Sequence, residues 1–395
     1  MATMNTAAEF LAELSNINFT SIQDDLHKKQ EALALAKKLT LTLESPIDRV
    51  LDFSHKPFSY LAIRMAVGLN LFEHICAAKE PISSAQLSKI SGGEELLITR
   101  ILRVIASINF VNQPGPYTWL ANPTTHTMAL PPIAANYRCE ALVRTAFYGT
   151  DFLAQTSWRN PTESRDGIFQ FATQTKLHLF DYLQTQPALF ADFNLFMGAV
   201  ANSQKNKWDW WDIEGRLIAG FDATKSDVLL VDVGGGKGHD IQDFQNKFGA
   251  KTEGKLVLQD LPKLIKGIKD GALESSIVKM GYDFFEEQPV KGARCYYLHH
   301  VLHDWPDKYC LEILAQVRKA MTPGYSKLVV HDLVLPDTGA SELQARFDLA
   351  MMTINSGMER SALQFRELLA SAGFKVTGVW SREEGDGIVE AEVEV

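Results

Sequence analysis

The sequence predicts an α/β protein in which a helical N-terminal region precedes a Rossmann-like, doubly wound parallel sheet. From about residue 226 onward, short apolar runs alternate with helical stretches, as in "DVLLVDVG", "KLVLQDLP", "ARCYYLHHVL", "KLVVHDLVLP" and "FKVTGVW". Such runs are typical of parallel strands buried on both faces, and the helices between them are typical of crossover connections. The tail "GIVEAEVEV" alternates apolar and polar residues, which suits a final antiparallel strand.

The region up to about residue 110 has helical periodicity. Apolar residues recur at three-, four- and seven-residue spacings from Ile22 to Leu43, and Ser45-Pro46 ends this predicted helix. Farther on, "EPISSAQLSKISGGEELLITRILRVIASINFV" predicts a helix, a turn, a second helix and a strand. A hairpin is predicted around Pro114-Gly115-Pro116. This order of elements is the outline of a winged helix.

A winged helix can read DNA or serve as a packing module. Residues 64–120 carry five basic and four acidic side chains, without the basic stripe expected of a DNA-reading helix. We therefore predict that residues 1–125 form a helical winged-helix dimerisation domain. Residues 126–215, again helical and rich in aromatic side chains, are predicted to be a linker and substrate-pocket region, and residues 216–395 the Rossmann-like domain.

The composition of the chain limits the kinds of binding partner and the compartment that we expect. The formal net charge of −9 disfavours nucleic acid and anionic membrane surfaces. The four cysteines, Cys76, Cys139, Cys295 and Cys310, form no CxxC pair and no zinc spacing, which favours a reducing compartment. The N-terminus lacks the pattern of a secretory signal, and no apolar run reaches the ~18 residues that span a bilayer. These observations predict a cytoplasmic protein.

A glycine-rich loop, "VDVGGGKGHD", follows the first predicted strand and opens a helix. Glycines at this place allow a tight turn and a close approach of a ligand to backbone N–H groups. The dinucleotide fingerprint fails because its last glycine would fall on His239, and the P-loop fails because Lys237 precedes Gly238. The prediction that remains is a ligand at the carboxyl end of the first strand.

Two acidic positions follow the next strands. Asp260 ends the second strand, where a carboxylate can accept two hydrogen bonds from a ribose diol or can cap the following helix. Asp283-Phe284 follows the third strand, where an acceptor beside an aromatic face suits adenine, although the pair alone would be an ordinary turn. With the glycine loop upstream, we favour the ribose role for Asp260.

Three histidines lie in "YYLHHVLHDWPDKYC". His299 and His300 are predicted to point to opposite faces of a strand, so they would not chelate a metal together. His303 lies just beyond the strand's carboxyl end, and Pro306 starts the next helix after it. Its imidazole is well placed for proton transfer near neutral pH. A lone histidine is more often structural, but its place at the ligand-binding edge favours the functional role.

Six segments now stand in a fixed order: VDVGGGKGHD, LQDLP, GYDFFEEQP, HHVLHDWPDKYC, VVHDLVLPD and NSGMERSALQFRELLASAGF. In this order the chain resembles the S-adenosylmethionine-dependent O-methyltransferases of the caffeate and isoflavone type. It is similar above all to their fungal relatives in secondary metabolism, which act on polyketide-derived phenols. The resemblance is strong over residues 226–380 and covers the N-terminal part in outline. It implies a class I methyltransferase sheet.

The resemblance also implies which residues hold S-adenosylmethionine. Gly234 and Gly236 would lie against its methionine part, Asp260 would bind the ribose, and Asp283-Phe284 the adenine end. His299 falls where the plant enzymes have a lysine near the cofactor.

For the chemistry, His303 matches the family's general base. Asp332 and Glu359 match the two acids that orient the imidazole through its other nitrogen, with an aspartate at 332 where plant members have a glutamate. The implied activity is methylation of a hydroxyl, phenolic by analogy, on a small aromatic substrate by a homodimer joined through the N-terminal module. The alternative is a methyltransferase-like cyclase or pericyclase that binds the cofactor without transferring methyl.

Overall fold

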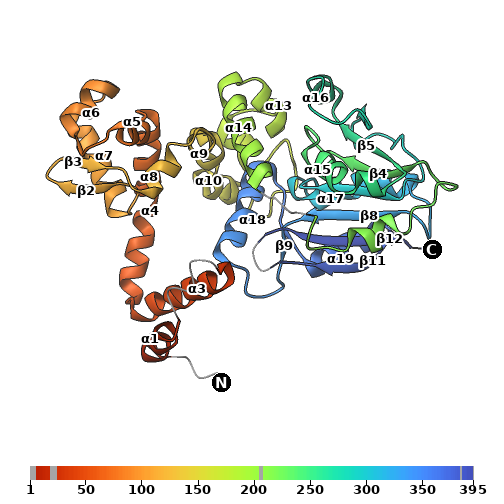
Figure 1. The fold of residues 1–395 in the computed structure, drawn as a ribbon, viewed down its shortest axis with the longest axis horizontal. Helices are drawn as coiled ribbons and strands as arrows, with labels where there is room; N and C mark the ends of the chain where they lie inside the picture. Colours follow the sequence, from red (N-terminus) through yellow and green to blue (C-terminus); the bar gives the residue numbers. More distant parts are fainter. Residues whose placement is uncertain (1–5, 18–24, 204–207, 383–384, 395) are drawn as a thin grey trace. The chain divides into compact units, whose positions relative to one another are not determined.

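The computed structural model describes residues 6–17, 25–203, 208–382 and 385–394 (Figure 1). The chain divides into two compact units, Met1–Arg138 and Cys139–Val395. No helix among the described residues is long and apolar enough to cross a membrane.

The first unit is mainly helical. Its helices are α1 (Ala7–Ser15), α3 (Leu26–Leu43), α4 (Pro46–Gly68), α5 (Leu71–Ala77), α6 (Ser84–Ser91), α7 (Glu95–Ser107), α8 (Pro123–Met128) and α9 (Pro131–Arg138). Ser45 caps α4 through its side chain, so Ser45-Pro46 ends one helix and begins the next. Ile22, where the sequence placed the beginning of the long helix, lies outside the described residues.

A small antiparallel sheet completes the first unit. Its strands β1 (Ile82–Ser83), β2 (Asn112–Gly115) and β3 (Thr118–Leu120) run in the order β1-β3-β2. The predicted hairpin is therefore confirmed, and Tyr117 makes its turn with a positive φ of 57°. Trp119 on β3 is fully buried against Phe72 and Leu102, which ties the sheet to the helices.

The second unit begins with a helical layer: α10 (Glu140–Phe147), α11 (Gly149–Gln155), α12 (Ile168–Thr173), α13 (Leu179–Gln184), α14 (Pro187–Ser203) and the π-helix Glu214–Ile218. Phe169, Leu179 and Leu183 pack with Ile354 of α18 (Glu342–Asn355) in one apolar cluster. The helical layer therefore packs on α18, whose last residue, Asn355, reaches the candidate site.

A seven-stranded sheet follows, with strand order β11-β12-β8-β7-β4-β5-β6. Its strands are β4 (Val228–Val233), β5 (Lys255–Asp260), β6 (Ile277–Gly281), β7 (Cys295–His299), β8 (Lys327–Asp332), β11 (Phe374–Trp380) and β12 (Gly387–Val393). Strands β6, β5, β4, β7 and β8 are neighbours in this order and pair in parallel. Strand β12 is antiparallel to both of its neighbours, β8 and β11. The predicted parallel sheet and its final antiparallel strand are confirmed.

Helices cover both faces of this sheet (Figure 1). On one face, Leu298 and Val330 pack with α17 (Asp307–Ala320) and α19 (Ala362–Ser371). On the other face, Tyr297 and Val329 pack with α15 (His239–Phe248) and with residues 208–218. Alternate residues of β7 thus belong to different cores, as a buried parallel strand requires.

Shorter elements complete the unit: α16 (Pro262–Lys266), the 3₁₀ turns Gly249–Lys251 and Leu302–Asp304, and the strand pair β9 (Val334–Leu335) and β10 (Arg360–Ser361). The turn Leu302–Asp304 connects β7 to α17 and carries His303.

Candidate active site

Three neighbouring parallel strands end at one edge of the sheet. Since β7, β4 and β5 are adjacent, the glycine loop after β4 lies between Asp260 at the end of β5 and the histidine-rich segment after β7. The carboxyl edge of such a sheet is where ligands bind in doubly wound folds.

The glycine loop is shaped for close approach. Gly234 and Gly236 have positive φ angles of 75° and 60°, which L-residues with side chains rarely adopt. A Cβ at Gly234 would lie 2.9 Å from Val301 Cγ2 and 3.6 Å from the Phe284 ring, so a side chain has no room. A Cβ at Gly236 would meet nothing within 4 Å, so this part of the loop borders open space.

Asp260 faces this loop. Its Oδ2 accepts a hydrogen bond from Gly236 N at 2.9 Å, and its Oδ1 accepts one from Leu261 N at 2.7 Å. Burial raises the pKa of Asp260, and these two backbone donors oppose the shift. The helix-cap alternative is wrong, because Leu261 is the N-cap of α16 and no described side chain makes a capping hydrogen bond to that helix.

Asp283 and Phe284 lie just after β6. The Asp283 carboxylate accepts a hydrogen bond from Phe285 N at 3.1 Å, so it does form a turn of its own. Phe284 lies edge-to-face with Trp305, with ring centroids 6.0 Å apart, and borders Gly234. Trp305 in turn stacks on His178, 4.7 Å away. The sequence reasoning did not single out Trp305 or His178.

His303 is held by one acid in the plane of its ring. Nδ1 lies 2.8 Å from Glu359 Oε1, so the Nδ1–H donates to this carboxylate. Nε2 lies 3.7 Å from Asp304 Oδ1, which is too long for a hydrogen bond. The His303 side chain retains 15% of its exposure, so the ring is not sealed in the core.

Asp332 differs from Glu359. This last residue of β8 is buried, and its carboxyl oxygens have no hydrogen-bond partner among the described residues. Burial raises the pKa of Asp332, and the charge of His303 opposes that shift. Glu359 therefore makes the contact expected of both acids, while Asp332 acts on the ring through charge alone.

The charge around His303 is strongly negative. Burial disfavours the imidazolium, but Asp304, Glu359 and Asp332 outweigh it and raise the pKa of His303 to about 10. Burial raises the pKa of Asp304 as well, and Asn355 Nδ2 donates to Asp304 Oδ1 at 2.5 Å. The sequence reasoning missed Asp304 as a site residue, although it adjoins His303 in the sequence.

The backbone of His303 is fixed from a distant segment. Met358 N donates to His303 O at 2.9 Å, and a Cβ at Gly357 would collide with that same oxygen. Arg360, 1% exposed, donates to Leu302 O and Trp305 O, both at 2.9 Å. The "GMER" motif thus clamps the turn on both sides of His303, in addition to supplying Glu359.

The prediction that His299 and His300 point to opposite faces is wrong. Strand β7 ends at His299, and His300 has a left-handed backbone with φ 52°. Their ring centroids are therefore only 4.2 Å apart, and both rings face Asp386. The His299 ring also contacts Asp240 of α15 through Nδ1, so carboxylates face both of its nitrogens.

His299, His331 and Asp386 bring potential metal-ligand atoms within 4.8 Å of one another. However, the rings of His299 and His331 are stacked 4.2 Å apart with only 14° between their planes. The in-plane lone pairs of stacked rings run parallel and do not converge on one ion, as tetrahedral coordination requires. This cluster is better described as an ion-paired histidine between two carboxylates. Burial disfavours the protonated His299 ring, but Asp240 and Asp386 outweigh burial and raise the pKa of His299 to about 9.

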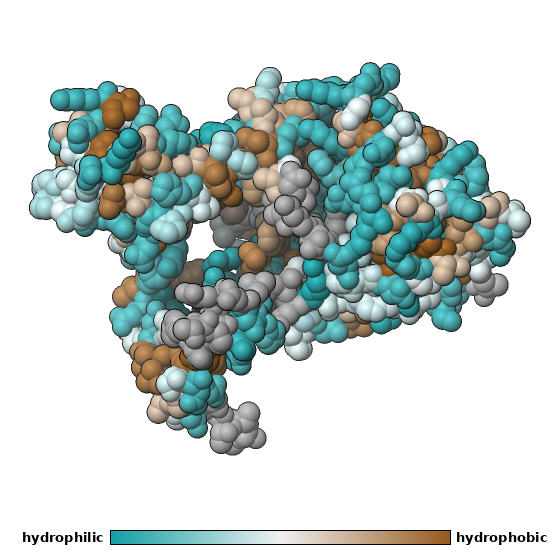
Figure 2. Space-filling view, in the orientation of Figure 1, coloured by the Kyte–Doolittle hydropathy of each residue, from teal (hydrophilic) through white to brown (hydrophobic). Residues whose placement is uncertain are grey.

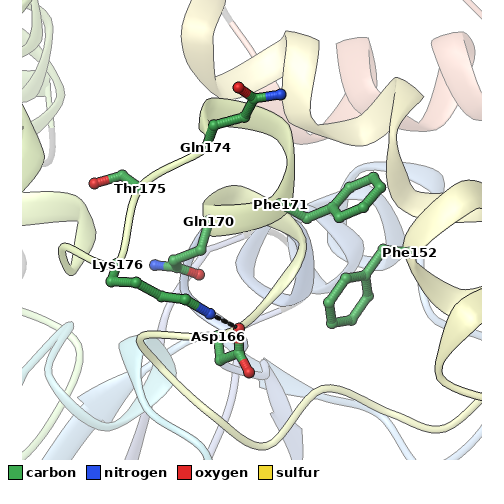
Figure 3. A pocket seen from close by; sticks show the side chains of 7 residues that line it. All are labelled: Phe152, Asp166, Gln170, Phe171, Gln174, Thr175 and Lys176. Carbon is green, nitrogen blue, oxygen red and sulfur yellow. Dashed lines mark hydrogen bonds and ion pairs between the residues drawn. The ribbon is translucent and has the colours of Figure 1, made fainter.

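A cavity of about 370 Å³ lies elsewhere in the second unit, against the helical layer (Figure 3). Phe152 and Phe171 form one wall, edge-to-face at 5.9 Å, and the Lys176–Asp166 ion pair closes another side. Its other lining residues are Gln170, Gln174 and Thr175. None of the predicted site residues lines this cavity.

Comparison with known proteins identifies the family of this chain. The family model of the O-methyltransferase domain (Methyltransf_2) matches residues 171–375, which include all nine predicted site residues. The O-methyltransferase penC of Penicillium thymicola is 40% identical over 374 residues, covering 93% of this chain and 92% of that protein.

Two solved structures share the fold over nearly the whole chain. LepI in complex with SAM has a TM-score of 0.84 at 28% identity, covering 98% of this chain and 100% of that chain. A structure described as a pericyclic reaction enzyme has the same TM-score and coverage at 27% identity. The family model spans more than half of the sequence, and penC matches almost all of it. The chain therefore belongs to the S-adenosylmethionine-dependent O-methyltransferases, of the type found in fungal secondary metabolism.

Proposed function

We propose that this enzyme methylates a phenolic hydroxyl of a small aromatic, polyketide-derived metabolite, with His303 as the general base. The observation that carries the proposal is the His303–Glu359 pair at the ligand-binding edge of the sheet. Glu359 accepts the hydrogen bond of the Nδ1–H, so the neutral ring presents Nε2 as its proton acceptor.

The residues around the glycine loop fit S-adenosylmethionine. Gly236 borders open space, so the backbone there can approach the methionine part closely, while Gly234 lets the turn pack against Val301 and Phe284. Each Asp260 oxygen accepts one backbone hydrogen bond and keeps a lone pair, which suits a ribose diol. Phe284, with Asp283 beside it, offers an aromatic face for adenine. When bound, S-adenosylmethionine supplies an electrophilic methyl group on a sulfonium.

His299 has a less direct role in this proposal. Since Asp240 and Asp386 face both of its ring nitrogens, it has no free N–H for the cofactor. We place it behind the cofactor site, where it joins the first turn of α15 to the loop before β12 and so supports the end of the glycine loop.

The high pKa of His303 suits a phenol. A phenol has a pKa of ~10, like tyrosine, and is a poor nucleophile while protonated. The carboxyls around His303 raise its pKa to about 10, so proton transfer from the phenol to Nε2 is close to balanced in energy. Glu359 then stabilises the imidazolium that forms. Because only neutral His303 accepts the proton, activity rises as the pH approaches this pKa.

The decisive experiment uses methyl-labelled S-adenosylmethionine and a panel of dihydroxyacetophenones as probes of polyketide-like phenols. Label in the ether product is expected, and His303→Ala should lower turnover by ~10²-fold or more, since general-base catalysis contributes 10²–10⁴. Cofactor affinity, measured by calorimetry, should persist. Unchanged turnover in His303→Ala would remove the histidine from the chemistry.

The competing function is a cofactor-assisted cyclisation or pericyclic reaction without methyl transfer, which the similarity to a pericyclic reaction enzyme favours. Against it, a fixed positive charge needs no general base, whereas His303, Asp304 and Glu359 together form an acid–base cluster. A product that carries no label, formed while the cofactor is recovered intact, would support cyclisation.

We also propose a cytoplasmic homodimer joined through the winged-helix module of the first unit. Helices α3 and α4 expose large apolar side chains, and apolar patches reach the surface there (Figure 2): Leu41, Leu43, Ile47, Val50, Leu51, Phe53 and Phe58 are each more than half exposed. Exposed apolar surface of this extent is typical of an interaction site. All four cysteines are free, in keeping with a reducing compartment.

Light scattering after size exclusion tests this assembly. The wild type should have the mass of two chains, and Val50→Asp combined with Phe53→Asp should have the mass of one. Thr127→Asp, on the exposed side of α8, is the matched control and should remain a dimer. A monomeric wild type would contradict the proposal.

A further inference from the structure

His300 has a backbone conformation that calls for an explanation. Its φ of 52° is left-handed, which is uncommon for any residue other than glycine, although histidine is among the more tolerant. Its N–H donates to His331 O at 3.2 Å, so the strained residue is anchored to β8. Strain of this kind persists where the surrounding structure holds it, and it concentrates at functional sites.

The strained backbone places the His300 ring against His303. The two rings are stacked, with centroids 4.9 Å apart and 21° between their planes. His300 Nε2 lies 3.2 Å from Asp386 Oδ1, and Asp386 is 6% exposed. The His300 side chain itself is 29% exposed. One side of His300 is therefore anchored to a buried acid while its face covers the proposed base.

We propose that His300 is a positioning residue for His303, an inference that rests on the proposed role of His303 as general base. Glu359 restrains the His303 ring through a single in-plane hydrogen bond, which leaves the ring free to tilt about that bond. The stacked His300 ring blocks this tilt from one face. Asp386, in the loop before β12, holds His300 in turn. The orientation of His303 Nε2 therefore depends on this loop as well as on Glu359.

Other groups near the pair do not replace this contact. Asp304 lies beyond hydrogen-bond distance of Nε2, and the Asp332 oxygens have no hydrogen-bond partner among the described residues. The His299 ring contacts His300 at 4.2 Å, so it supports His300 rather than His303. Glu359 and His300 are thus the two direct restraints on the His303 ring that these contacts provide.

The test is a double-mutant cycle with the full-length chain, S-adenosylmethionine and the dihydroxyacetophenone turned over fastest. His300→Ala should lower kcat roughly 10- to 100-fold, because small misplacements of a catalytic group have effects of this size. The KM for S-adenosylmethionine should change less than about twofold. His300→Phe, which keeps a ring to stack, should recover part of the loss. His126→Ala, an exposed histidine of α8, is the control.

The cycle separates positioning from an independent role. If His300 acts through His303, the double variant should be no slower than His303→Ala alone, since residues that act as a unit are not additive. A multiplicative loss, or a kcat for His300→Ala within twofold of wild type, would overturn the inference. If His303→Ala itself keeps full activity, the proposed base fails and the positioning role fails with it. If His303→Ala loses activity while His300→Ala keeps it, the positioning role fails and the proposed function stands.

A substrate-independent measurement completes the test. With histidines labelled at the ring carbon, the NMR titration of His303 in the complex with S-adenosylhomocysteine should shift in His300→Ala and return towards the wild type in His300→Phe. His300→Gly, which relieves the left-handed strain, serves where the alanine variant fails to fold. An unaltered His303 signal in a folded variant without the ring would refute the contact.

Discussion

Replacing Glu359 by glutamine isolates the one hydrogen bond that orients the proposed base. The Glu359 side chain is 4% exposed, and its Oε1 lies 2.8 Å from His303 Nδ1. Its Oε2 is buried and has no hydrogen-bond partner in the part of the chain that the structure describes. Glutamine keeps the shape of the side chain and removes its charge. The variant therefore changes the electrostatics and the tautomer of His303 while the packing is preserved.

The expected loss follows from the strength of that bond. A hydrogen bond to a charged group contributes about 1.5–3 kcal/mol, which corresponds to roughly 10- to 150-fold in rate. If the glutamine amide donates to Nδ1, the neutral ring carries its proton on Nε2 and cannot accept one from the substrate, which deepens the loss. We therefore expect the plateau of kcat to fall by at least about tenfold.

The pH profile gives a second, independent signature. Burial opposes protonation of His303, and Asp304, Glu359 and Asp332 together raise its pKa to about 10. Removing one of these charges lowers the pKa, so neutral His303 appears at lower pH. The acidic limb of kcat/KM should move to lower pH while the plateau falls.

The assay is label transfer from S-adenosylmethionine to the chosen dihydroxyacetophenone, measured from neutral pH up to the His303 pKa of about 10. Glu367→Gln, an exposed position on α19, should leave both the plateau and the limb in place. A limb that moves to higher pH in Glu359→Gln, or a plateau equal to the wild type, would refute the orienting role.

Two further predictions concern the cofactor and the clamp. Asp260→Asn should weaken the binding of S-adenosylmethionine roughly 10- to 150-fold in calorimetry, because a hydrogen bond to a charged acceptor contributes about 1.5–3 kcal/mol. Asp270→Asn, at an exposed position, should not change the affinity. Equal affinities of the two variants would exclude the ribose contact. Gly357→Ala places a Cβ against His303 O, so it should lower kcat and destabilise the fold by about 1–3 kcal/mol in thermal unfolding. Gly198→Ala, with open space around its Cβ, should be neutral or slightly stabilising, and identical behaviour of the two alanines would contradict the clamp.

The sheet was predictable because its central strands are buried on both faces. Short apolar runs such as "VLLVDV" and "CYYLH", which alternate with helical stretches, indicate interior strands, and both are strands in the structure. Strand β6, with the sequence "IVKMG", was not in the series of apolar runs, because it lies at the edge of the sheet and three of its five residues are exposed. "FKVTGVW" resembled a buried parallel strand, but it is the edge strand β11, which runs in the same direction as β8 and pairs only with the antiparallel strand β12.

Within the site, the sequence indicated residue types but not their partners. Glu359 and Asp332 looked equivalent, and which acid reaches the imidazole depends on the path of a turn 56 residues away from His303. The face of His300 was predicted wrongly because strand alternation stops where the backbone turns left-handed. Arg360 and Gly357 were missed because each lies against a backbone oxygen of a turn far away in the sequence. Arg360 donates to Leu302 O, and Gly357 packs against His303 O, and no local pattern reveals such contacts.

A base whose pKa lies near 10 is largely protonated in the resting enzyme at neutral pH, and the charge of the cofactor should reduce the protonated fraction. A positive charge placed beside an imidazolium disfavours its charged form, so a bound sulfonium should lower the pKa of His303 below its value of about 10 in the free enzyme. S-adenosylhomocysteine has the same shape around a neutral thioether. NMR titration of ring-labelled histidine should therefore give a lower His303 pKa with S-adenosylmethionine than with S-adenosylhomocysteine. Equal pKa values in the two complexes would mean that the sulfonium lies too far from His303 to deliver its methyl group to an oxygen that this ring deprotonates.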